Sequence, residues 1–358
     1  MPYYIDTEHT DMRQVAFDVI QGIDLPDWKD VKSVDEIEIS RVSGMLKAVL
    51  FYYIGAMTNI IFKVVIKNKN CQSLLLRAYG NCTDLFLNRE TEVKIFKLLS
   101  DNNFGISLIK TFPGGRLELW RDGYRAMTAP EMRSPKLSVG IAKKLAVMHS
   151  IQKGAHDKEA YFRRLHAWVE AIKKIPMNGH MKEVRVDLLK DEVDDFVRRI
   201  IVDDYEVVFG HHDLQHGNIL KNENDDIIFV DYEYSGEISV ASDIANHFCE
   251  WMTDYNLPDS HLLRRAWHPT VEQQKLFIGA YLKERQGREP TEEEVEKLRE
   301  MVLKHEMMSH LHWFIWGLLE CQLSDIDWDY WGYAVCRWNY YKEMKKEYFD
   351  ADVLPIMP

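Results

Sequence analysis

The 358-residue chain has few cysteines, and they follow no recognisable pattern. Its five cysteines, with no CxxC pair among them, are Cys71, Cys82, Cys249, Cys321 and Cys336. An odd and scattered set of this kind argues against a disulfide framework and is typical of a reducing compartment.

The chain also lacks long apolar runs and an excess of basic residues. The longest apolar stretch, residues 48–57 (AVLFYYIGAM), is far shorter than the roughly 20 residues of a membrane-spanning helix. The first residues, MPYYIDTEHTDMRQ, lack the basic-then-apolar order of a signal peptide. A formal net charge of −12 argues against nucleic-acid partners and anionic lipid surfaces, but suits a cationic small molecule. We therefore expect a cytoplasmic protein without nucleic-acid binding or stable membrane insertion.

The length and an apolar content of 46% suit a chain of two lobes with a sizeable core. The first third has the composition of strands, at residues 36–40 (EIEIS), 59–66 (NIIFKVVI) and 73–80 (SLLLRAYG). Helical spacing of apolar residues then predicts a helix over 89–100.

Beyond about residue 120 the patterns are mostly helical. Ser138 is a candidate helix cap, and the capping box Thr291–Glu294 predicts the start of a long helix. We therefore predict an α+β fold of two lobes. A small β-rich N-lobe would span residues 1–120, and a large helical C-lobe would span 121–358.

The stretch HHDLQHGNIL, residues 211–220, places three histidines close together, which raises the question of a metal site. A zinc site needs about four ligands. His211 and His212 are adjacent, so their side chains point apart, and His216 follows in a segment between predicted strands rather than on a helix. At most two of these histidines could bind one ion, which disfavours the zinc interpretation.

A phosphotransferase loop accounts for the other residues of this stretch. Asp213 and Asn218 are five apart, the spacing at which kinases place a catalytic base and a magnesium-binding asparagine. Asp231 follows the next short predicted strand, and two hard oxygen ligands of this kind suit Mg²⁺ beside ATP phosphates. Such residues can also simply cap turns, but their correlated order favours the kinase interpretation.

Upstream, Arg77 and Glu92 occur in the order of a kinase's nucleotide-binding residues. Arg77 lies in a predicted strand, and Glu92 lies on the following predicted helix, where the two could pair. Either residue alone would be an ordinary surface charge.

Together with these residues, seven stretches make the chain resemble the choline/ethanolamine kinase family. In family order, from about residue 36 to residue 345, they are GAMTNIIFKV, LLLRAYG, FPGGRLE, GHHDLQHGNIL, FVDYEYSG, DIANHFCEWMTDY and SHLHWFIWGLLECQLSDIDWDYWGYA. The resemblance implies a bilobal protein-kinase-like fold with a nucleotide-binding N-lobe and a catalytic, amino-alcohol-binding C-lobe. It also implies ATP-dependent, Mg²⁺-dependent phosphorylation of choline or ethanolamine, the first step of phosphatidylcholine or phosphatidylethanolamine synthesis. It is also compatible with a homodimer.

The resemblance further implies roles for individual residues. Asp213 would be the catalytic base, with Asn218 and Asp231 as metal ligands. The residues expected to serve the nucleotide are Thr58, Asn59, Arg77, Glu92 and Gln215.

Aromatic pairs near the C-terminus suggest where the amine binds. Trp313 and Trp316 are three apart on a predicted helix and share a face, and Tyr330 and Tyr333 repeat that spacing. Aromatic faces hold an ammonium group with about 0.5–2 kcal/mol each.

Glu250 and Tyr255 would add a carboxylate and another ring to this cage. Core packing is the alternative for such aromatics, and we expect it for Trp328 and Trp338. The resemblance favours the cage for the other four rings and leaves choline versus ethanolamine open.

Three features depart from the family pattern. His212 stands where the family usually has asparagine, and EISVAS (residues 237–242) replaces a Tyr-Asn-rich turn. Residues 45–55 (MLKAVLFYYIG) interrupt an otherwise family-like ISRVSGAMTN, as an insertion or as a lengthened strand. The alternatives are thus a pseudokinase or amine-binding protein disabled by the insertion, or a related small-molecule kinase of aminoglycoside-phosphotransferase type.

Overall fold

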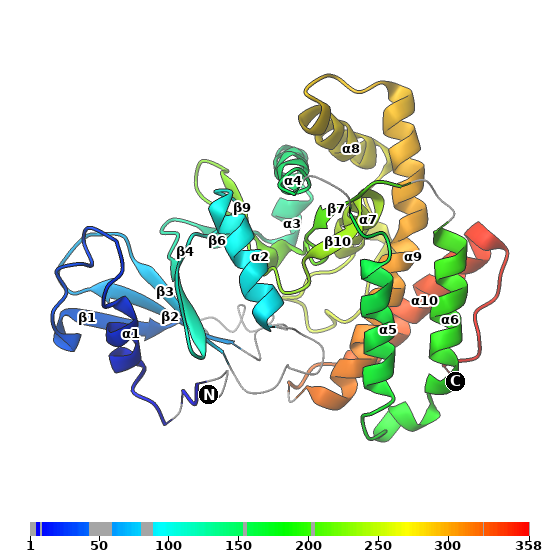
Figure 1. Cartoon of the computed structure of the whole chain (residues 1–358). Helices are drawn as coiled ribbons and strands as arrows, with labels where there is room; N and C mark the ends of the chain where they lie inside the picture. The colour runs from blue at the N-terminus through cyan, green and yellow to red at the C-terminus, as the bar shows by residue number, and fades with distance from the viewer. Residues whose placement is uncertain are drawn as a thin grey trace. The chain divides into compact units, whose positions relative to one another are not determined.

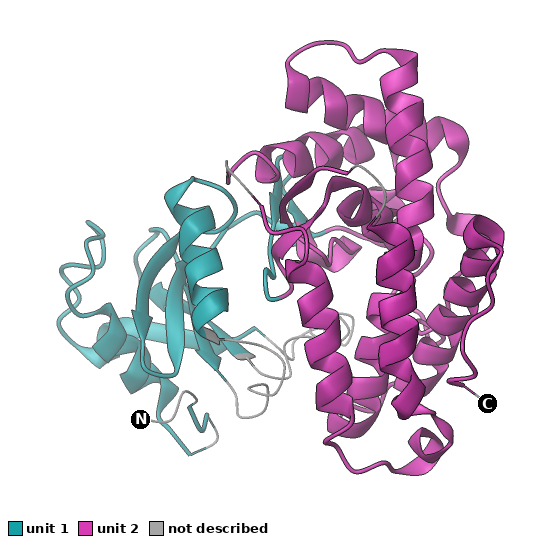
Figure 2. Cartoon of the chain, turned by 45° about the vertical axis from the view of Figure 1, so that its right-hand side comes forward, with its two compact units in different colours: residues 1–126, 220–233 teal, residues 127–219, 234–358 magenta. Residues whose placement is uncertain are grey.

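A computed structural model of the chain describes residues 5–7, 9–42, 59–79, 89–152, 156–201, 205–324 and 326–357. Thr58 and the segment 45–55 lie outside these residues. The chain divides into two compact units, one of residues 1–126 and 220–233 and the other of residues 127–219 and 234–358 (Figure 2). Our expected boundary at residue 120 falls near the end of the first segment, whereas the residues 220–233 had been assigned to the other lobe.

Unit 1 is built on a five-stranded antiparallel sheet. Its strands in spatial order are β1 (Ile37–Arg41), β2 (Asn59–Ile66), β3 (Leu74–Tyr79), β5 (Gly115–Leu119) and β4 (Leu108–Phe112). The central strand β3 is buried at all six positions, as its nearly continuous apolar sequence predicts.

Helices and a small second sheet complete unit 1. Helix α1 (Met12–Ile20) begins at the cap Asp11 and packs its buried face into the core beside the sheet, and α2 (Arg89–Asp101) lies beside β4 (Figure 1). The short turn η1 (Val34–Glu36) leads into β1. The second sheet has the order β6 (Arg125–Ala126), β8 (Ile219–Lys221) and β9 (Ile227–Phe229).

Unit 2 is mostly helical. Its helices are α3 (Ala129–Met132), α4 (Pro135–Met148), α5 (Ala160–Ile172), α6 (Val186–Ile200), α7 (Val240–Glu250), α8 (Val271–Gln286), α9 (Glu292–Leu323) and α10 (Tyr330–Phe349). The 3₁₀ turns are η4 (Gly179–Glu183), η5 (His216–Asn218) and η6 (Arg265–Trp267). Strands β7 (Val207–Gly210) and β10 (Gly236–Ser239) form an antiparallel pair that leads directly into α7.

Helix α9 forms the centre of unit 2. It starts at Thr291 with the predicted capping box, and the residues from His305 to Glu320 are all buried because α5, α7, α8 and α10 pack around it (Figure 1). Ser138, which we expected as a helix cap, is instead buried inside α4. That helix begins one turn earlier, after Ser134, because Pro135 is well suited to a first helical position.

None of the described helices combines the length and the apolar content that a membrane crossing requires.

A buried carboxylate joins the C-terminal part of unit 2 to α6. The fully buried Glu192 accepts hydrogen bonds from Tyr341 Oη (2.7 Å), Lys345 Nζ (2.6 Å) and the main-chain N–H of Leu354 (2.9 Å). Lys345 also pairs with Asp195 at 2.8 Å. Removing Glu192 would therefore leave the buried Lys345 ammonium group without its closest carboxylate partner, with the Asp195 contact remaining.

We predict that Glu192→Ala lowers the free energy of unfolding by about 3 kcal/mol, because breaking a buried ion pair strands its partner. Chemical denaturation monitored by circular dichroism measures the difference. Asp191→Ala, at an exposed position on the same helix, is the matched control and should change stability by less than about 0.5 kcal/mol. Equal effects of the two substitutions would contradict a structural role for Glu192.

Candidate active site

The loop after β7 is held by one buried carboxylate. Asp243, in the first turn of α7, accepts hydrogen bonds from the main-chain N–H groups of His211 and His212, both at 2.8 Å, and from His149 Nε2 at 2.9 Å. Burial opposes ionisation of this carboxyl, but the hydrogen bond and the charge of His149, with those main-chain N–H groups, keep the pKa of Asp243 well below its usual value. Gly210 permits this approach, because a Cβ there would lie 2.6 Å from Asp243 Oδ2.

His212, the departure from the family pattern, fits this loop without disturbing it. Its φ of 68° lies in the left-handed region, where asparagine and histidine are both enriched among non-glycine residues. Its carbonyl accepts a hydrogen bond from Asn246 Nδ2 at 2.9 Å, and its Nδ1 contacts Arg164. Burial and the Arg164 cation lower the pKa of His212, so the imidazole is neutral. Histidine and asparagine are thus both suited to this left-handed main-chain conformation.

The loop fixes Asp213 and Asn218 against each other. Asn218 Nδ2 donates to the main-chain oxygen and to Oδ2 of Asp213, both at 2.8 Å, so the amide oxygen of Asn218 points away from that carboxylate. Gln215 caps the turn, its Oε1 accepting from the N–H of Gly217 at 2.7 Å. Asp213 is half-buried, whereas Gln215 and Asn218 are buried.

The histidines of this stretch have packing roles. His216 Nδ1 donates to the carbonyl of Met127 (3.2 Å), and His211 Nδ1 accepts from the N–H of Asp213 (3.3 Å). Among the described residues they belong to no group of metal-binding side chains.

Four aromatic rings from α9, α10 and the segment between them form one cluster. The ring centroid of Trp316 lies 5.7 Å from Tyr330 and 5.9 Å from Tyr333. Trp328 lies 4.9 Å from Tyr330 and 5.2 Å from Tyr333, so this half-buried tryptophan belongs to the cluster although we expected it in the core. Trp338 does lie in the core, packed on Phe314.

Trp313 connects this aromatic cluster to the loop. Its ring lies 5.3 Å from that of Trp316, and its indole N–H donates to Asn246 Oδ1 at 2.7 Å. The same Asn246 holds the carbonyl of His212. The orientation of Trp313 is thus tied to that of the residue preceding Asp213.

Glu250 is fully engaged by protein partners. Arg337 Nη2 donates to its Oε1 at 2.6 Å, and Tyr255 Oη donates to its Oε2 at 2.8 Å. Both charged side chains are at most 1% exposed, and Arg337 also lies over the ring of Tyr333 at 5.0 Å. Sequence reasoning missed Arg337, although its position four residues after Tyr333 on one helix places it on the same face.

The carboxylate of Asp213 lies near these tyrosines. Burial raises the pKa of Tyr255 and of Tyr333, and the negative charges of Glu250 and Asp213 raise both further. Asp213 is therefore within electrostatic reach of two rings that also contact Glu250 or Arg337.

In unit 1, Arg77 and Glu92 belong to a buried network of four charges. Glu118 Oε1 accepts from Arg77 Nε (3.1 Å) and Arg116 Nε (2.7 Å), and Arg116 Nη1 donates to Glu92 Oε1 (2.7 Å). We had considered a pair of Arg77 with Glu92, and the structure connects them through Arg116 and Glu118. The stretch FPGGRLE contains both linking residues, but only the fold shows that they face Arg77.

The other predicted residues of unit 1 are placed as follows. Asn59 is the first residue of β2, opposite Tyr79 of β3, whereas Thr58 is not among the described residues. Burial raises the pKa of Asp231, and the nearby Arg77 cation opposes that rise, so Asp231 lies within reach of the four-charge network.

Comparison with known proteins identifies the family. The family model for choline/ethanolamine kinase matches residues 52–342. The chain belongs to this family. It is 34% identical to a probable choline kinase 3 of Arabidopsis thaliana, over 88% of each chain, and 32% identical to a choline/ethanolamine kinase of Rattus norvegicus, over 81% of this chain and 79% of that one.

The solved structures agree with this family membership. A choline kinase from Cryptosporidium parvum has a TM-score of 0.75 at 26% identity, covering 95% of this chain and 96% of the other. The predicted kinase-like α+β fold, with a sheet-rich N-terminal and a helical C-terminal part, is confirmed.

A cavity of about 380 Å³ borders the aromatic cluster of this family member. Glu320, Trp328 and Tyr330 are among its lining residues. Burial raises the pKa of Glu320 to about 7, from an ordinary value of 4.5.

The raised pKa of Glu320 predicts that this residue lowers the stability of the fold as the pH rises. Between pH 4.5 and 7 the unfolded state releases the Glu320 proton while the folded state keeps it, so this residue destabilises the fold as pH rises through that window. Glu320→Gln should therefore be more stable than the wild type by about 2–3 kcal/mol at pH 8, with little difference at pH 4.5. Thermal unfolding at both pH values measures this.

The control Glu300→Gln, at an exposed position of α9, should show the same small difference at both pH values. A Glu320→Gln effect that does not change with pH would contradict the raised pKa.

Proposed function

We propose that this choline/ethanolamine kinase uses the half-buried Asp213 as the base that accepts the proton of the substrate hydroxyl. The observation that carries this proposal is the Asp213–Asn218 contact beside the aromatic cluster. Asn218 holds the carboxylate of Asp213 with one hydrogen bond and its main-chain oxygen with another, and the charge of Asp213 reaches Tyr255 and Tyr333. A fixed base next to an aromatic amine site suits an alcohol whose other end is an ammonium group.

The amine end would be recognised mainly by aromatic faces. The rings proposed for this role are Trp313, Trp316, Tyr330, Tyr333 and Tyr255. Because Arg337 neutralises Glu250, the rings and the charge of Asp213 are left to balance the cation. We propose that Glu250 acts by fixing Tyr255 and Arg337 rather than by carrying an uncompensated charge.

In unit 1, the residues that we propose for the nucleotide are Arg77, Glu92, Thr58 and Asn59. Arg77, supported by the network that ends at Glu92, offers a cation for ATP phosphates, and Thr58 and Asn59 belong to the segment proposed to cover them. Gln215 would contribute through the turn that it caps. These groups bind and orient ATP for transfer of its γ-phosphoryl group.

The proposed Mg²⁺ ligands are Asn218 and Asp231. An amide oxygen and a carboxylate are the hard oxygen donors that this ion prefers, so the residue types fit. Asn218 directs its amide nitrogen to Asp213, which leaves its oxygen for a cation. When bound, Mg²⁺ neutralises charge on the ATP phosphates.

The two alternatives are less well supported. A disabled pseudokinase is not favoured, because the match to the family extends over most of the chain. A substrate of aminoglycoside type is not favoured, because the relatives that match over most of the chain are choline and ethanolamine kinases. A homodimer and a cytoplasmic location remain predictions.

We predict that Asp213→Asn lowers kcat at least about 100-fold, as removal of a general base does, with little change in the KM for ATP. Coupled ADP-release assays with choline or ethanolamine measure both constants, and circular dichroism checks the fold. Glu223→Gln, an exposed substitution ten residues away, should leave kcat unchanged. A folded Asp213→Asn enzyme with more than a tenth of wild-type kcat would exclude the proposed base.

A further inference from the structure

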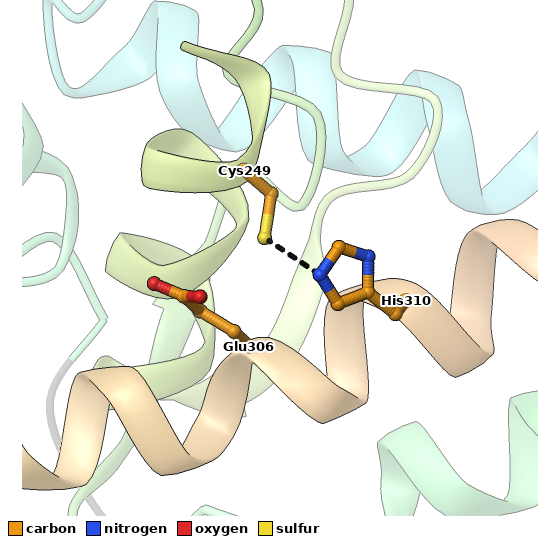
Figure 3. A group of neighbouring side chains, drawn as sticks. All are labelled: Cys249, Glu306 and His310. Atoms are coloured by element: carbon orange, nitrogen blue, oxygen red, sulfur yellow. Dashed lines mark hydrogen bonds between the residues drawn. The ribbon is translucent and has the colours of Figure 1, made fainter. Parts of the chain in front are cut away.

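Three buried side chains outside the proposed active site converge between α7 and α9. They are Cys249 at the end of α7 and Glu306 and His310, four residues apart on α9 (Figure 3). Their ligand atoms all lie within 4.8 Å of one another, and Cys249 Sγ is 3.8 Å from His310 Nε2. Two ligands on one helix face and a third on a facing helix can surround a single ion.

We propose that Cys249, Glu306 and His310 form a binding site for a thiophilic divalent cation, with Zn²⁺ as its ligand. A thiolate, a carboxylate and an imidazole are three of the donors that zinc uses in proteins, with water as the fourth ligand. In a tetrahedral site, ordinary Zn–S and Zn–N lengths separate sulfur from nitrogen by roughly 3.6 Å. The observed distance of 3.8 Å between Cys249 Sγ and His310 Nε2 is close to this value, so only a small side-chain movement is needed for both atoms to bind one ion.

The charges of the three side chains favour the site with a bound divalent ion over the site without one. A thiolate and a carboxylate carry two negative charges, so one Zn²⁺ makes the buried set neutral. Zinc binding displaces the thiol proton of Cys249, which leaves to solvent. Sulfur selects zinc over magnesium, which distinguishes this site from the nucleotide-bound ion.

Glu306 is already oriented for this role. Its Oε1 pairs with His268 Nε2 at 2.7 Å, which leaves Oε2 for the ion. Carboxylates that bind metals are commonly held by such an outer hydrogen bond. The His268 side chain is 21% exposed, so the cluster lies near solvent on this side.

The site would connect two helices that carry the amine-binding residues. Cys249 directly precedes Glu250, and His310 lies one helical turn before Trp313. An ion held by both α7 and α9 stabilises their packing, and so raises the unfolding temperature.

Cobalt substitution tests the proposal on the full-length protein without nucleotide. Chelator-treated protein is titrated with Co²⁺ under reducing conditions, and absorption is followed for the sulfur-to-cobalt charge-transfer band that a thiolate ligand gives. We expect one Co²⁺ per chain with this band, its displacement by Zn²⁺ but not by Mg²⁺, and a rise in the unfolding temperature with Zn²⁺.

Variants identify the ligands. Cys249→Ser should abolish the charge-transfer band and the Zn²⁺-dependent stabilisation, and His268→Ala should weaken binding by about 10–100-fold. Cys336→Ser, which changes another cysteine of unit 2, should retain both signals. The absence of a charge-transfer band in the wild type, or its persistence in folded Cys249→Ser, would overturn the site. Circular dichroism of Cys249→Ser shows whether a lost signal reflects lost binding or a lost fold. His268→Ala, at a partly exposed position, is an independent variant that tests the same site.

Discussion

The site in unit 2 depends on the carboxylate of Asp243. Its two oxygens bind the N–H groups of His211 and His212, the residues that lead into Asp213. A carboxylate in the first turn of α7 is favoured there by the positive end of the helix dipole, and His149 adds a further donor. Because Asp243 cannot move without breaking these buried bonds, the conformation of the loop that leads into Asp213 is fixed by the fold itself.

Three helices connect this fixed loop to the aromatic cluster through residues at the same helical spacing. On α7 these residues are Asp243, Asn246 and Glu250; on α9 they are Ser309, Trp313 and Trp316; on α10 they are Tyr330, Tyr333 and Arg337. Each set has spacings of three and four, so each lies along one helix face. Hydrogen bonds of Asn246 with His212, Ser309 and Trp313 join α7 and α9, and the Arg337–Glu250 ion pair joins α10 to α7. Each buried charge here has an opposite charge or hydrogen-bond partner, which a buried charge requires.

Elements with local sequence signals could be predicted from the sequence. Strand β2 spans the predicted residues 59–66, and Thr291 caps α9 with its box, because these signals are local. Partners that meet only through the fold were not predictable. Three such residues are Arg116, Arg337 and Asp243. Their neighbours in the sequence do not show that Arg116 contacts Glu92, that Arg337 contacts Glu250 or that Asp243 binds the loop. We missed the start of α4 because Ser134 and Ser138 are both of a residue type that caps helices. Pro135 at the first helical position selects Ser134.

We infer that this fixed loop and the aromatic cluster make a working amino-alcohol kinase. The decisive experiment incubates the 358-residue chain with ATP, Mg²⁺ and either choline, ethanolamine or neither, and follows products by phosphorus nuclear magnetic resonance. We expect phosphocholine or phosphoethanolamine in equal amount to ADP, and no ADP without the amino alcohol. Absence of turnover with both alcohols, or ADP release independent of them, would contradict this inference.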